Sequence, residues 1–319
     1  MPRVVEVPEW LAEGDSRLEF LIGYSLLPIG GAMTLYGAPE SGKSLVTLQL
    51  AFELSVGRPW LGVFATRQGR TLYIETEMTA RQTKRRAARM LRALGIDGAG
   101  VAVVTVEGLK VGTPLGDAEL DGMLLSYRPD LLVIDSLLDV FPGGANNQEA
   151  AGLFYASLNI VRARYGCAIV LVAHARKTLF TKEGLSTDAG LEELLGSMYH
   201  GKWPDTIIRL GRGKSWSMRF DKIREGSPME PLPLALDEES MLFTAKETVN
   251  VRREIQDLLK DGAVRLDQLR QHLMALGVSE STVNRAVWAM RDAELIVVEE
   301  DSTNKRHKVV SLLDATRES

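Results

Sequence analysis

One eight-residue segment constrains the fold of this chain more than any other. Residues 37–44 read Gly-Ala-Pro-Glu-Ser-Gly-Lys-Ser, between the apolar run 32–36 and a helical pattern over 42–56. This segment fits G-x-x-x-x-G-K-[S/T], a loop that needs a strand before it and a helix after it. Gly37 and Gly42 let the backbone bend so that N–H groups approach phosphate oxygens, and the helix N-terminus points to the same place. The segment therefore predicts a nucleotide-phosphate site on an α/β scaffold.

The side chains of this loop have separate expected roles. Lys43 would bring a full positive charge to the outer phosphates, and Ser44 would supply a hydroxyl ligand for Mg²⁺. We therefore expect ATP and Mg²⁺ at this loop. The residues expected to contact the nucleotide are Gly37, Ala38, Pro39, Glu40, Ser41, Gly42, Lys43, Ser44 and Leu45.

Apolar, strand-like runs alternate with helical patterns between residues 32 and 245. The expected strands are 32–36, 70–75, 101–106, 130–135, 167–173, 205–210 and 217–223, and the expected helices are 42–56, 79–95, 116–127 and 147–165. This alternation predicts an α/β fold, a mostly parallel β-sheet with helices on both faces and a nucleotide at the carboxyl ends of its strands. The segment 211–216 between the last two runs predicts an antiparallel hairpin at one edge.

The chain is expected to divide into three parts. A lead-in over 1–30 forms either a peripheral cap or an arm that packs on a neighbouring subunit. The α/β domain covers 31–245, and the proline-interrupted, acidic stretch before 246 separates it from a small domain over 246–319. Because helical patterns at 249–260, 265–276 and 279–292 precede a hairpin with a polar tip, we expect this domain to be a winged helix-turn-helix.

The charge of the small domain leaves its partner open. Residues 246–319 contain 12 Lys and Arg against 13 Asp and Glu, so the domain is not basic as a whole. A local stripe of cations could still contact a nucleic-acid backbone. The candidate residues are Arg285, Arg291, Lys305, Arg306 and Lys308. A protein-interaction role is the alternative.

Charged or polar side chains also stand at the carboxyl ends of three expected strands. Asp135 ends the run 130–135, where a rigid strand could hold it beside Ser44 as a Mg²⁺-organising carboxylate. Glu75 and Glu77 lie two apart at the end of the second strand, expected on one face next to the phosphate loop, and either could activate the attacking water. His174 could hydrogen-bond the γ-phosphate or simply pack under the next loop.

Two basic segments have less specific patterns. A helix over residues 81–92 carries Arg81, Lys84, Arg85, Arg86, Arg89 and Arg92. Such a face is usually solvated, although one planar guanidinium could stack on a nucleobase. The polar segment 176–190 is locally basic and suits either a nucleic-acid backbone or solvent.

Together these residues resemble the RecA/DnaB superfamily, in particular RepA-like ATPases of the hexameric helicase type, over about residues 20–230. The residues that carry the resemblance are the loop 37–44, Glu77 before Met78, Asp135, Asn147, and His174 with Lys177. Ala173 replaces the first of two histidines in the family pattern. The resemblance implies a RecA-like fold in which Glu77 is the catalytic glutamate, Asp135 binds Mg²⁺ and His174 senses the γ-phosphate. It also implies that Arg86 stacks on adenine.

The segment Phe220-Asp-Lys222-Ile-Arg224-Glu-Gly resembles a strand of DnaB-type helicases that acts across a subunit interface. The resemblance implies that Lys222 and Arg224 assist catalysis at a neighbour's γ-phosphate, in a homo-hexameric ring with single-stranded DNA through it. In RepA-like proteins the trans-acting arginine comes from slightly earlier, near Lys202 here, so that assignment stays open. The motifs fit a DNA helicase or translocase, an ATP-controlled DNA-binding regulator or replication initiator, and less well a RadA-like recombinase.

Composition limits the remaining classes. The chain has 319 residues and a net charge of −4, so any surface for nucleic acid must be local. The single cysteine, Cys167, allows no intramolecular disulfide, which fits a reducing compartment. Because no apolar run approaches the ~20 residues that span a bilayer, we expect a cytoplasmic protein without a membrane partner.

Overall fold

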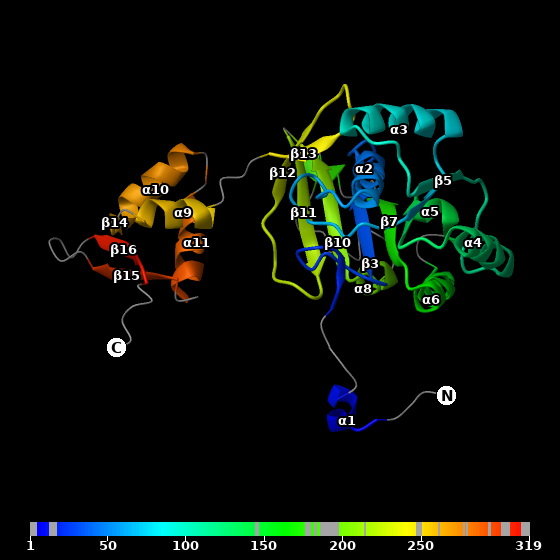
Figure 1. Ribbon diagram of the computed structural model, residues 1–319, viewed down its shortest axis with the longest axis horizontal. Coiled ribbons are helices and arrows are strands. Elements are labelled where there is room, and N and C mark those ends of the chain that lie inside the picture. Colours follow the sequence, from blue (N-terminus) through cyan, green and yellow to red (C-terminus); the bar gives the residue numbers. More distant parts are fainter. Residues whose placement is uncertain are drawn as a thin grey trace. The chain divides into compact units, whose positions relative to one another are not determined.

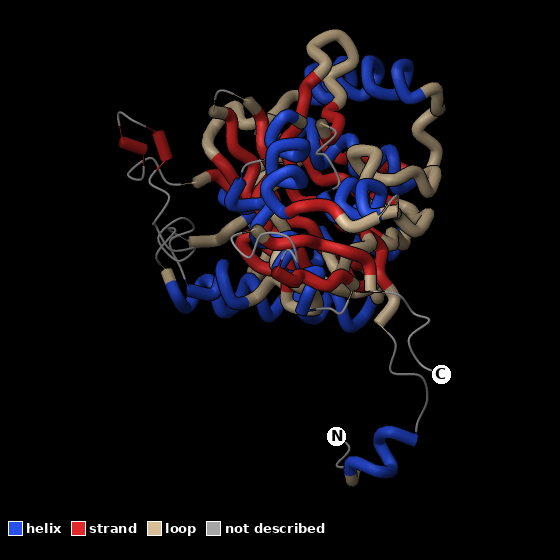
Figure 2. The backbone as a smooth tube through the Cα atoms, turned by 90° about the vertical axis from the view of Figure 1, so that its left-hand side faces the viewer, coloured by secondary structure: helices blue, strands red, loops and turns tan. Residues whose placement is uncertain are grey.

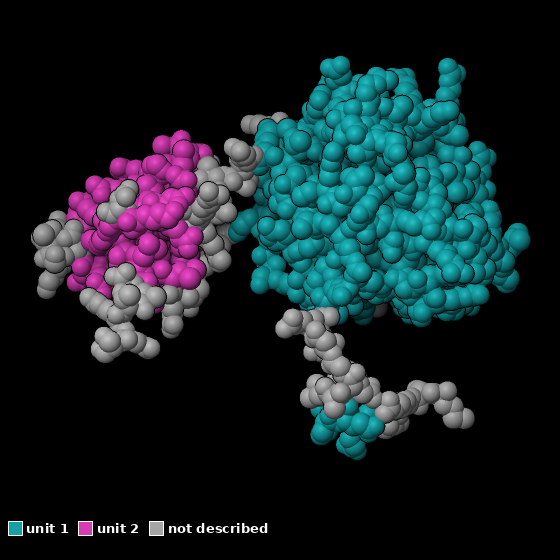
Figure 3. Space-filling view, viewed as in Figure 1, with its two compact units in different colours: residues 1–246 teal, residues 247–319 magenta. Residues whose placement is uncertain are grey.

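The computed structural model describes residues 5–12, 18–143, 147–175, 180–181, 184–185, 198–213, 215–246, 251–260, 262–276, 278, 280–292, 295–300 and 307–313. The chain forms two compact units, Met1–Lys246 and Glu247–Ser319, which Figure 3 colours separately. None of the helices in these ranges is both long and apolar enough to cross a membrane.

A nine-stranded sheet forms the centre of the first unit. Its order is β13-β12-β11-β10-β3-β7-β6-β4-β5. The strands of the parallel part are β3 (Ala32–Gly37), β4 (Thr71–Glu75), β5 (Val101–Thr105), β6 (Leu131–Asp135), β7 (Ala168–His174) and β10 (Thr206–Arg212). The strands β11 (Trp216–Ile223), β12 (Leu232–Leu236) and β13 (Phe243–Ala245) extend one edge in antiparallel fashion. The predicted mostly parallel sheet and its edge hairpin are therefore confirmed.

Helices cover both faces of this sheet. The helices α2 (Lys43–Ser55) and α3 (Ala80–Leu94) pack on one face, whereas α4 (Pro114–Tyr127), α5 (Leu137–Val140) and α6 (Gln148–Tyr165) pack on the other (Figure 1). The same layering is visible with helices and strands coloured separately (Figure 2). In β7, Val170 and Val172 enter the first core while Ile169 and Leu171 enter the second. Because both faces are buried, the strand is continuously apolar in sequence.

Side-chain caps set where several of these helices begin and end. Thr79 and Gln82 form a reciprocal capping box at the start of α3, and Gly95 ends that helix in the left-handed conformation. Asn147 caps α6 by accepting the N–H of Ala150 at 3.0 Å. In the structure, the asparagine that the family resemblance singled out is therefore a helix N-cap.

Two parts of the first unit differ from expectation. The stretch 224–245 was expected to lose regular structure, but it contains β12 and β13, which pair with the main sheet. The sequence hides β12 because Pro233 lies inside it, which is tolerated near a sheet edge. Residues expected in the lead-in form β1 (Phe20–Ile22) and β2 (Leu27–Pro28), and Leu21 and Leu26 are buried in the same core as α2.

The second unit has a separate apolar core. Its elements are α9 (Val251–Leu259), β14 (Val264–Arg265), α10 (Leu266–Ala275), α11 (Glu280–Asp292), β15 (Ile296–Glu300) and β16 (Lys308–Leu312). The three strands form an antiparallel sheet in the order β14-β16-β15. Ile255, Leu269, Val287 and Val310 are fully buried between the helices and this sheet. The predicted three helices and C-terminal hairpin are present, and β14 adds a third strand.

Four short elements complete the description. They are α1 (Val7–Ala12), β8 (Phe180–Thr181), β9 (Gly184–Leu185) and α8 (Met198–Lys202). The remaining residues of the basic segment 176–190, including Lys177 and Lys182, lie outside the described residues, as do Lys305 and Arg306 and the side chain of Arg285.

Candidate functional site

The phosphate loop connects β3 to α2, and two glycines are required by close contacts. A Cβ on Gly37 would lie 2.2 Å from the carbonyl oxygen of Leu210. A Cβ on Gly42 would lie 2.7 Å from the ring of Phe243, and its φ of +81° falls in the left-handed region. The loop can therefore adopt this path only with glycine at both positions.

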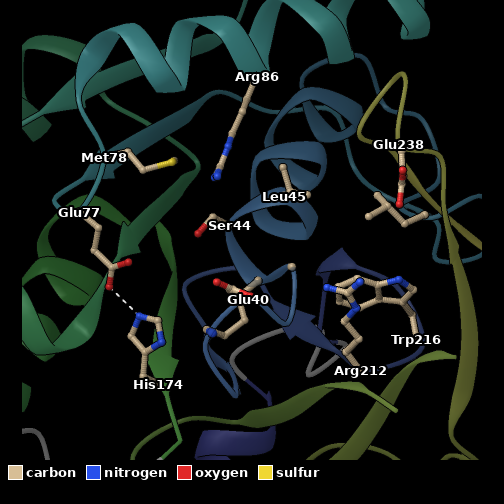
Figure 4. Close-up of a pocket in the computed structure, with 13 residues that line it drawn as sticks. Glu40, Ser44, Leu45, Glu77, Met78, Arg86, His174, Arg212, Trp216 and Glu238 are labelled. Carbon is tan, nitrogen blue, oxygen red and sulfur yellow. Dashed lines mark hydrogen bonds and ion pairs between the residues drawn. The ribbon is translucent and has the colours of Figure 1, made fainter. Parts of the chain in front are cut away.

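A cavity of about 420 Å³ opens beside this loop and is lined by the loop, α3 and the antiparallel edge of the sheet (Figure 4). Lys43 is the first residue of α2 and is almost completely buried at its wall. Its Nζ donates to the carbonyl oxygen of Ala38 at 2.7 Å. Burial lowers the pKa of Lys43 to about 8, although Asp135 and Glu77 act in the opposite direction. The loop thus holds a cation where phosphate would bind.

Asp135 lies at the carboxyl end of β6 and is buried. The hydroxyl of Tyr73 on β4 donates to its Oδ2 at 2.6 Å. Burial raises the pKa of Asp135, and hydrogen bonds from Tyr73 and Ser44 act the other way. A hydroxyl and one carboxylate suit Mg²⁺, which usually binds one or two carboxylates together with substrate phosphates. Ser44 and Asp135 would hold that ion, and no pattern in the sequence points to Tyr73 behind them.

Glu77 and His174 meet at the wall of the cavity. Glu77 follows β4 in a turn, His174 ends β7, and the Oε1 and Nε2 atoms are 2.6 Å apart (Figure 4). The hydrogen bond with His174 is the main cause that lowers the pKa of Glu77. An ionised carboxylate at this position can accept a proton from water or orient it. The structure therefore brings together the glutamate and histidine that the family resemblance paired with the phosphate loop.

The expectation that Glu75 and Glu77 share one strand face was wrong. The strand ends at Glu75, whose side chain is buried, and the next residues form a turn. Burial, with a smaller effect of the Asp135 charge, raises the pKa of Glu75 to about 7. The strand β4 was also expected next to the phosphate-loop strand, but β7 and β6 lie between them. Parallel strands joined by crossover helices need not follow sequence order.

The far end of the cavity offers groups for a nucleoside. Arg86 extends from α3 into the cavity, as Figure 4 shows. Trp216, Leu236 and Glu238 line it from the antiparallel edge, and the Arg212 guanidinium lies 4.9 Å from the Trp216 ring centroid. An aromatic face and a planar guanidinium can both stack on a base. Sequence reasoning found Arg86 but missed the edge residues, which lie on strands that only the tertiary pairing brings here.

Lys222 and Arg224 bind groups of their own chain at a different place. The Nζ of Lys222 donates to the carbonyl oxygens of Gly201, Lys202 and Pro204 at 3.1, 3.1 and 2.6 Å. Arg224 pairs with Asp205 at 2.6 Å and donates to the Lys202 carbonyl oxygen at 2.9 Å. Within the described part of the chain, neither cation lines the cavity. Both instead hold the end of α8, so any role at a neighbour's site requires these contacts to change.

Comparisons with known proteins place these observations in a family. A family model described as AAA domain matches residues 3–179, more than half of the chain. One solved structure, an isolated ATPase domain, has a TM-score of 0.55 at 14% identity, covering 76% of this chain and 96% of that one. A KaiC-like protein from the hyperthermophilic archaeon Pyrococcus horikoshii OT3 has a TM-score of 0.49 at 16% identity, covering 71% and 93%. The likeness to the solved ATPase domain shows a RecA-like fold, and no curated protein matches the chain.

Proposed function

The chain belongs to the AAA domain family and carries a P-loop ATPase domain, and we propose that it is a ring-forming, Mg²⁺-dependent ATPase that acts on DNA. The observation that supports this proposal most is the cavity itself. Lys43, Ser44, Glu77, His174 and Arg86 come from four different elements and all line it. Helicase or translocase activity is the form of this function that we favour.

The geometry suggests a role for each group in hydrolysis. The N–H groups of the loop and the start of α2 would bind the β- and γ-phosphates, and Lys43 would neutralise their charge. Ser44 and Asp135 would hold Mg²⁺, which screens the phosphate oxygens when bound. Glu77 would accept a proton from the water that attacks the γ-phosphorus, as the bond to the ADP oxygen breaks. His174, bound to Glu77, would respond to loss of the γ-phosphate through that same hydrogen bond.

Assembly into a ring would complete this site. Lys222 and Arg224 match the strand that acts in trans in DnaB-type helicases, and we assign them that role at the neighbouring subunit. A homo-hexamer with single-stranded DNA through its centre follows from the same resemblance. Arg224 is about half exposed, so a change of partner needs no opening of the core.

The second unit would contribute DNA contacts as a winged helix-turn-helix. The Trp288 ring lies 4.6 Å from the Arg291 guanidinium and 5.0 Å from the Lys308 ammonium. These cations lie on α11 and β16, the elements that a winged helix places in or beside a DNA groove. The cluster supports a local basic surface on a domain that is not basic as a whole.

One observation favours a second candidate function. Lys222 and Arg224 are fully engaged by backbone carbonyls and Asp205 of their own chain. A chain in which these contacts are permanent would lack trans catalysis, and would suit an ATP-controlled DNA-binding regulator or replication initiator. A RadA-like recombinase is a weaker alternative.

Measurement of ATP hydrolysis with and without DNA separates these functions. We expect single-stranded DNA to stimulate hydrolysis several-fold, and we expect unwinding of a forked duplex. Glu77→Gln should bind ATP without hydrolysing it, because an amide cannot act as the base. Native mass spectrometry of that variant with ATP should then give a hexamer. An ATP-bound monomer or dimer whose hydrolysis ignores single-stranded DNA would contradict the motor and favour the regulator.

A further inference from the structure

We propose that Glu75 is a positioning residue for hydrolysis, which fixes the turn that carries Glu77 by accepting two of its backbone N–H groups. The proposal rests on the proposed function, because it concerns how the glutamate assigned as the base is held. It assigns no chemistry to Glu75 itself.

The contacts of Glu75 converge on the turn. Its Oε1 accepts the N–H of Glu77 and the N–H of Met78, each at 2.9 Å. Glu75 itself is the last residue of β4, pairs in register with Asp135 of β6, and is only 1% exposed. One oxygen of a rigid, buried side chain thus holds both donors, on the Glu77 residue and on the residue after it.

The other side of the turn is held by a hydroxyl. Thr76 Oγ1 accepts the N–H of Ser136 at 2.8 Å and lies 2.9 Å from Oδ2 of Asp139. The backbone N–H of Thr76 also donates to the Asp135 carbonyl oxygen at 2.8 Å. The turn is therefore tied to the end of β6, which carries the Mg²⁺-organising carboxylate. Only the Glu77 side chain leaves this network toward the cavity, where it meets His174.

The geometry makes an acceptor at position 75 more important than a charge. Oε2 of Glu75 is buried and has no hydrogen-bond partner among the described residues. A glutamine could keep the Oε1 contacts and place its amide nitrogen where Oε2 is. A leucine of similar size would leave two N–H groups without an acceptor, and an aspartate would be one methylene too short. A small misplacement of a reacting group can reduce a rate by about 10²-fold.

Three substitutions test this role against the matched control Glu107→Leu, an exposed position after the neighbouring strand β5. Glu75→Leu and Glu75→Asp should lower kcat about 10- to 100-fold, whereas KM and the Kd of a fluorescent ATP analogue stay within about threefold. Glu75→Gln should keep kcat within about threefold of the wild type. Hydrogen exchange of the peptide spanning 75–79, without nucleotide, should be faster in Glu75→Leu and unchanged in Glu75→Gln.

The outcomes separate this role from its alternatives. Wild-type kcat in both Glu75→Leu and Glu75→Asp would overturn the proposal, and so would unchanged exchange of the 75–79 peptide. A loss in Glu75→Gln as deep as in Glu77→Gln would make Glu75 a base and also overturn it. Should Glu75→Leu fail to fold, the Asp and Gln variants still decide. Full activity in Glu77→Gln would instead refute the proposed base, while the exchange data would still report whether Glu75 holds the turn.

Discussion

At the residue scale, Lys43 shows how a site for phosphate conflicts with folding. Its side chain is 4% exposed, and burial lowers its pKa to about 8 from an ordinary 10.5. The unfolded chain therefore holds this proton more tightly than the folded chain does. Consequently the lysine reduces stability below about pH 8, and this cost shrinks as the pH rises from about 8 to 10.5. Functional residues commonly carry such a cost.

We predict that Lys43→Met abolishes ATP hydrolysis and, without nucleotide, stabilises the fold at pH 7. Methionine keeps the apolar stem and removes the buried charge, so the gain should be on the order of 1–3 kcal/mol. Thermal or urea unfolding at pH 7 and pH 10 measures it, and the gain should be smaller at pH 10. Lys84→Met on the exposed face of α3 is the control. Normal hydrolysis in Lys43→Met would remove the basis of the ATPase site.

Residues of the site differ in how far the sequence reveals them. Gly37, Lys43 and Asp135 stand in patterns that local backbone geometry demands, so they can be read directly. Tyr73 and Glu75 act only through contacts with β6 and the following turn, and nothing in their immediate sequence announces those contacts. Their roles depend on strand pairing, which a linear pattern does not specify.

At the element scale, the antiparallel edge of the sheet depends on one glutamine. Gln49 on α2 is buried, and its Nε2 donates to the Phe243 carbonyl oxygen while its Oε1 accepts the Phe243 N–H, both at 2.8 Å. The amide thus pairs with β13 as another strand would. Because Phe243 also packs against Gly42, this contact connects the edge to the phosphate loop.

We predict that Gln49→Leu lowers the free energy of unfolding by about 2–4 kcal/mol, because it leaves two buried backbone groups without partners. Urea titration of the full chain measures the loss. Gln68→Leu is the control, since it removes one contact between an exposed side chain and Ser55 and should cost less than about 1 kcal/mol. A cost at position 49 no larger than at position 68 would show that the amide does not hold β13.

The same edge marks the limit of prediction for elements. Long buried strands and capped helices of the parallel part could be located from apolar runs and turn residues. The strands β12 and β13 are short, and their stability comes from pairing with β11 and from Gln49 rather than from local propensity. They could not be separated from a linker by pattern alone.

At the scale of the whole molecule, the two units bury separate cores, and the chain passes between them after Lys246. We predict that a chain ending at Lys246 folds and keeps its basal ATPase activity. Its affinity for DNA should fall, and the dependence of that affinity on salt should become weaker, because cations of the second unit are lost. Gel shifts at several salt concentrations measure both. An unaltered affinity would make the second unit a protein-interaction domain.

The ring itself is tested through Arg224. If its guanidinium stabilises transition-state charge at a neighbour's site, Arg224→Ala should lower hydrolysis by about 10³-fold. The competing interpretation is that Arg224 only pairs with Asp205 and holds the end of α8. Arg219→Ala, an exposed arginine on the same strand β11, is the matched control and should stay active.

Mixing two inactive variants distinguishes these interpretations. Arg224→Ala subunits have intact phosphate loops, and Lys43→Met subunits have an intact Arg224. In a randomly mixed ring, about a quarter of the interfaces would join a working loop to a working arginine, because each interface uses a different surface of its two subunits. Activity should therefore return in the mixture, although neither parent is active. Mixtures that stay inactive after verified subunit exchange would argue against action in trans, and normal hydrolysis by Arg224→Ala alone would end that assignment.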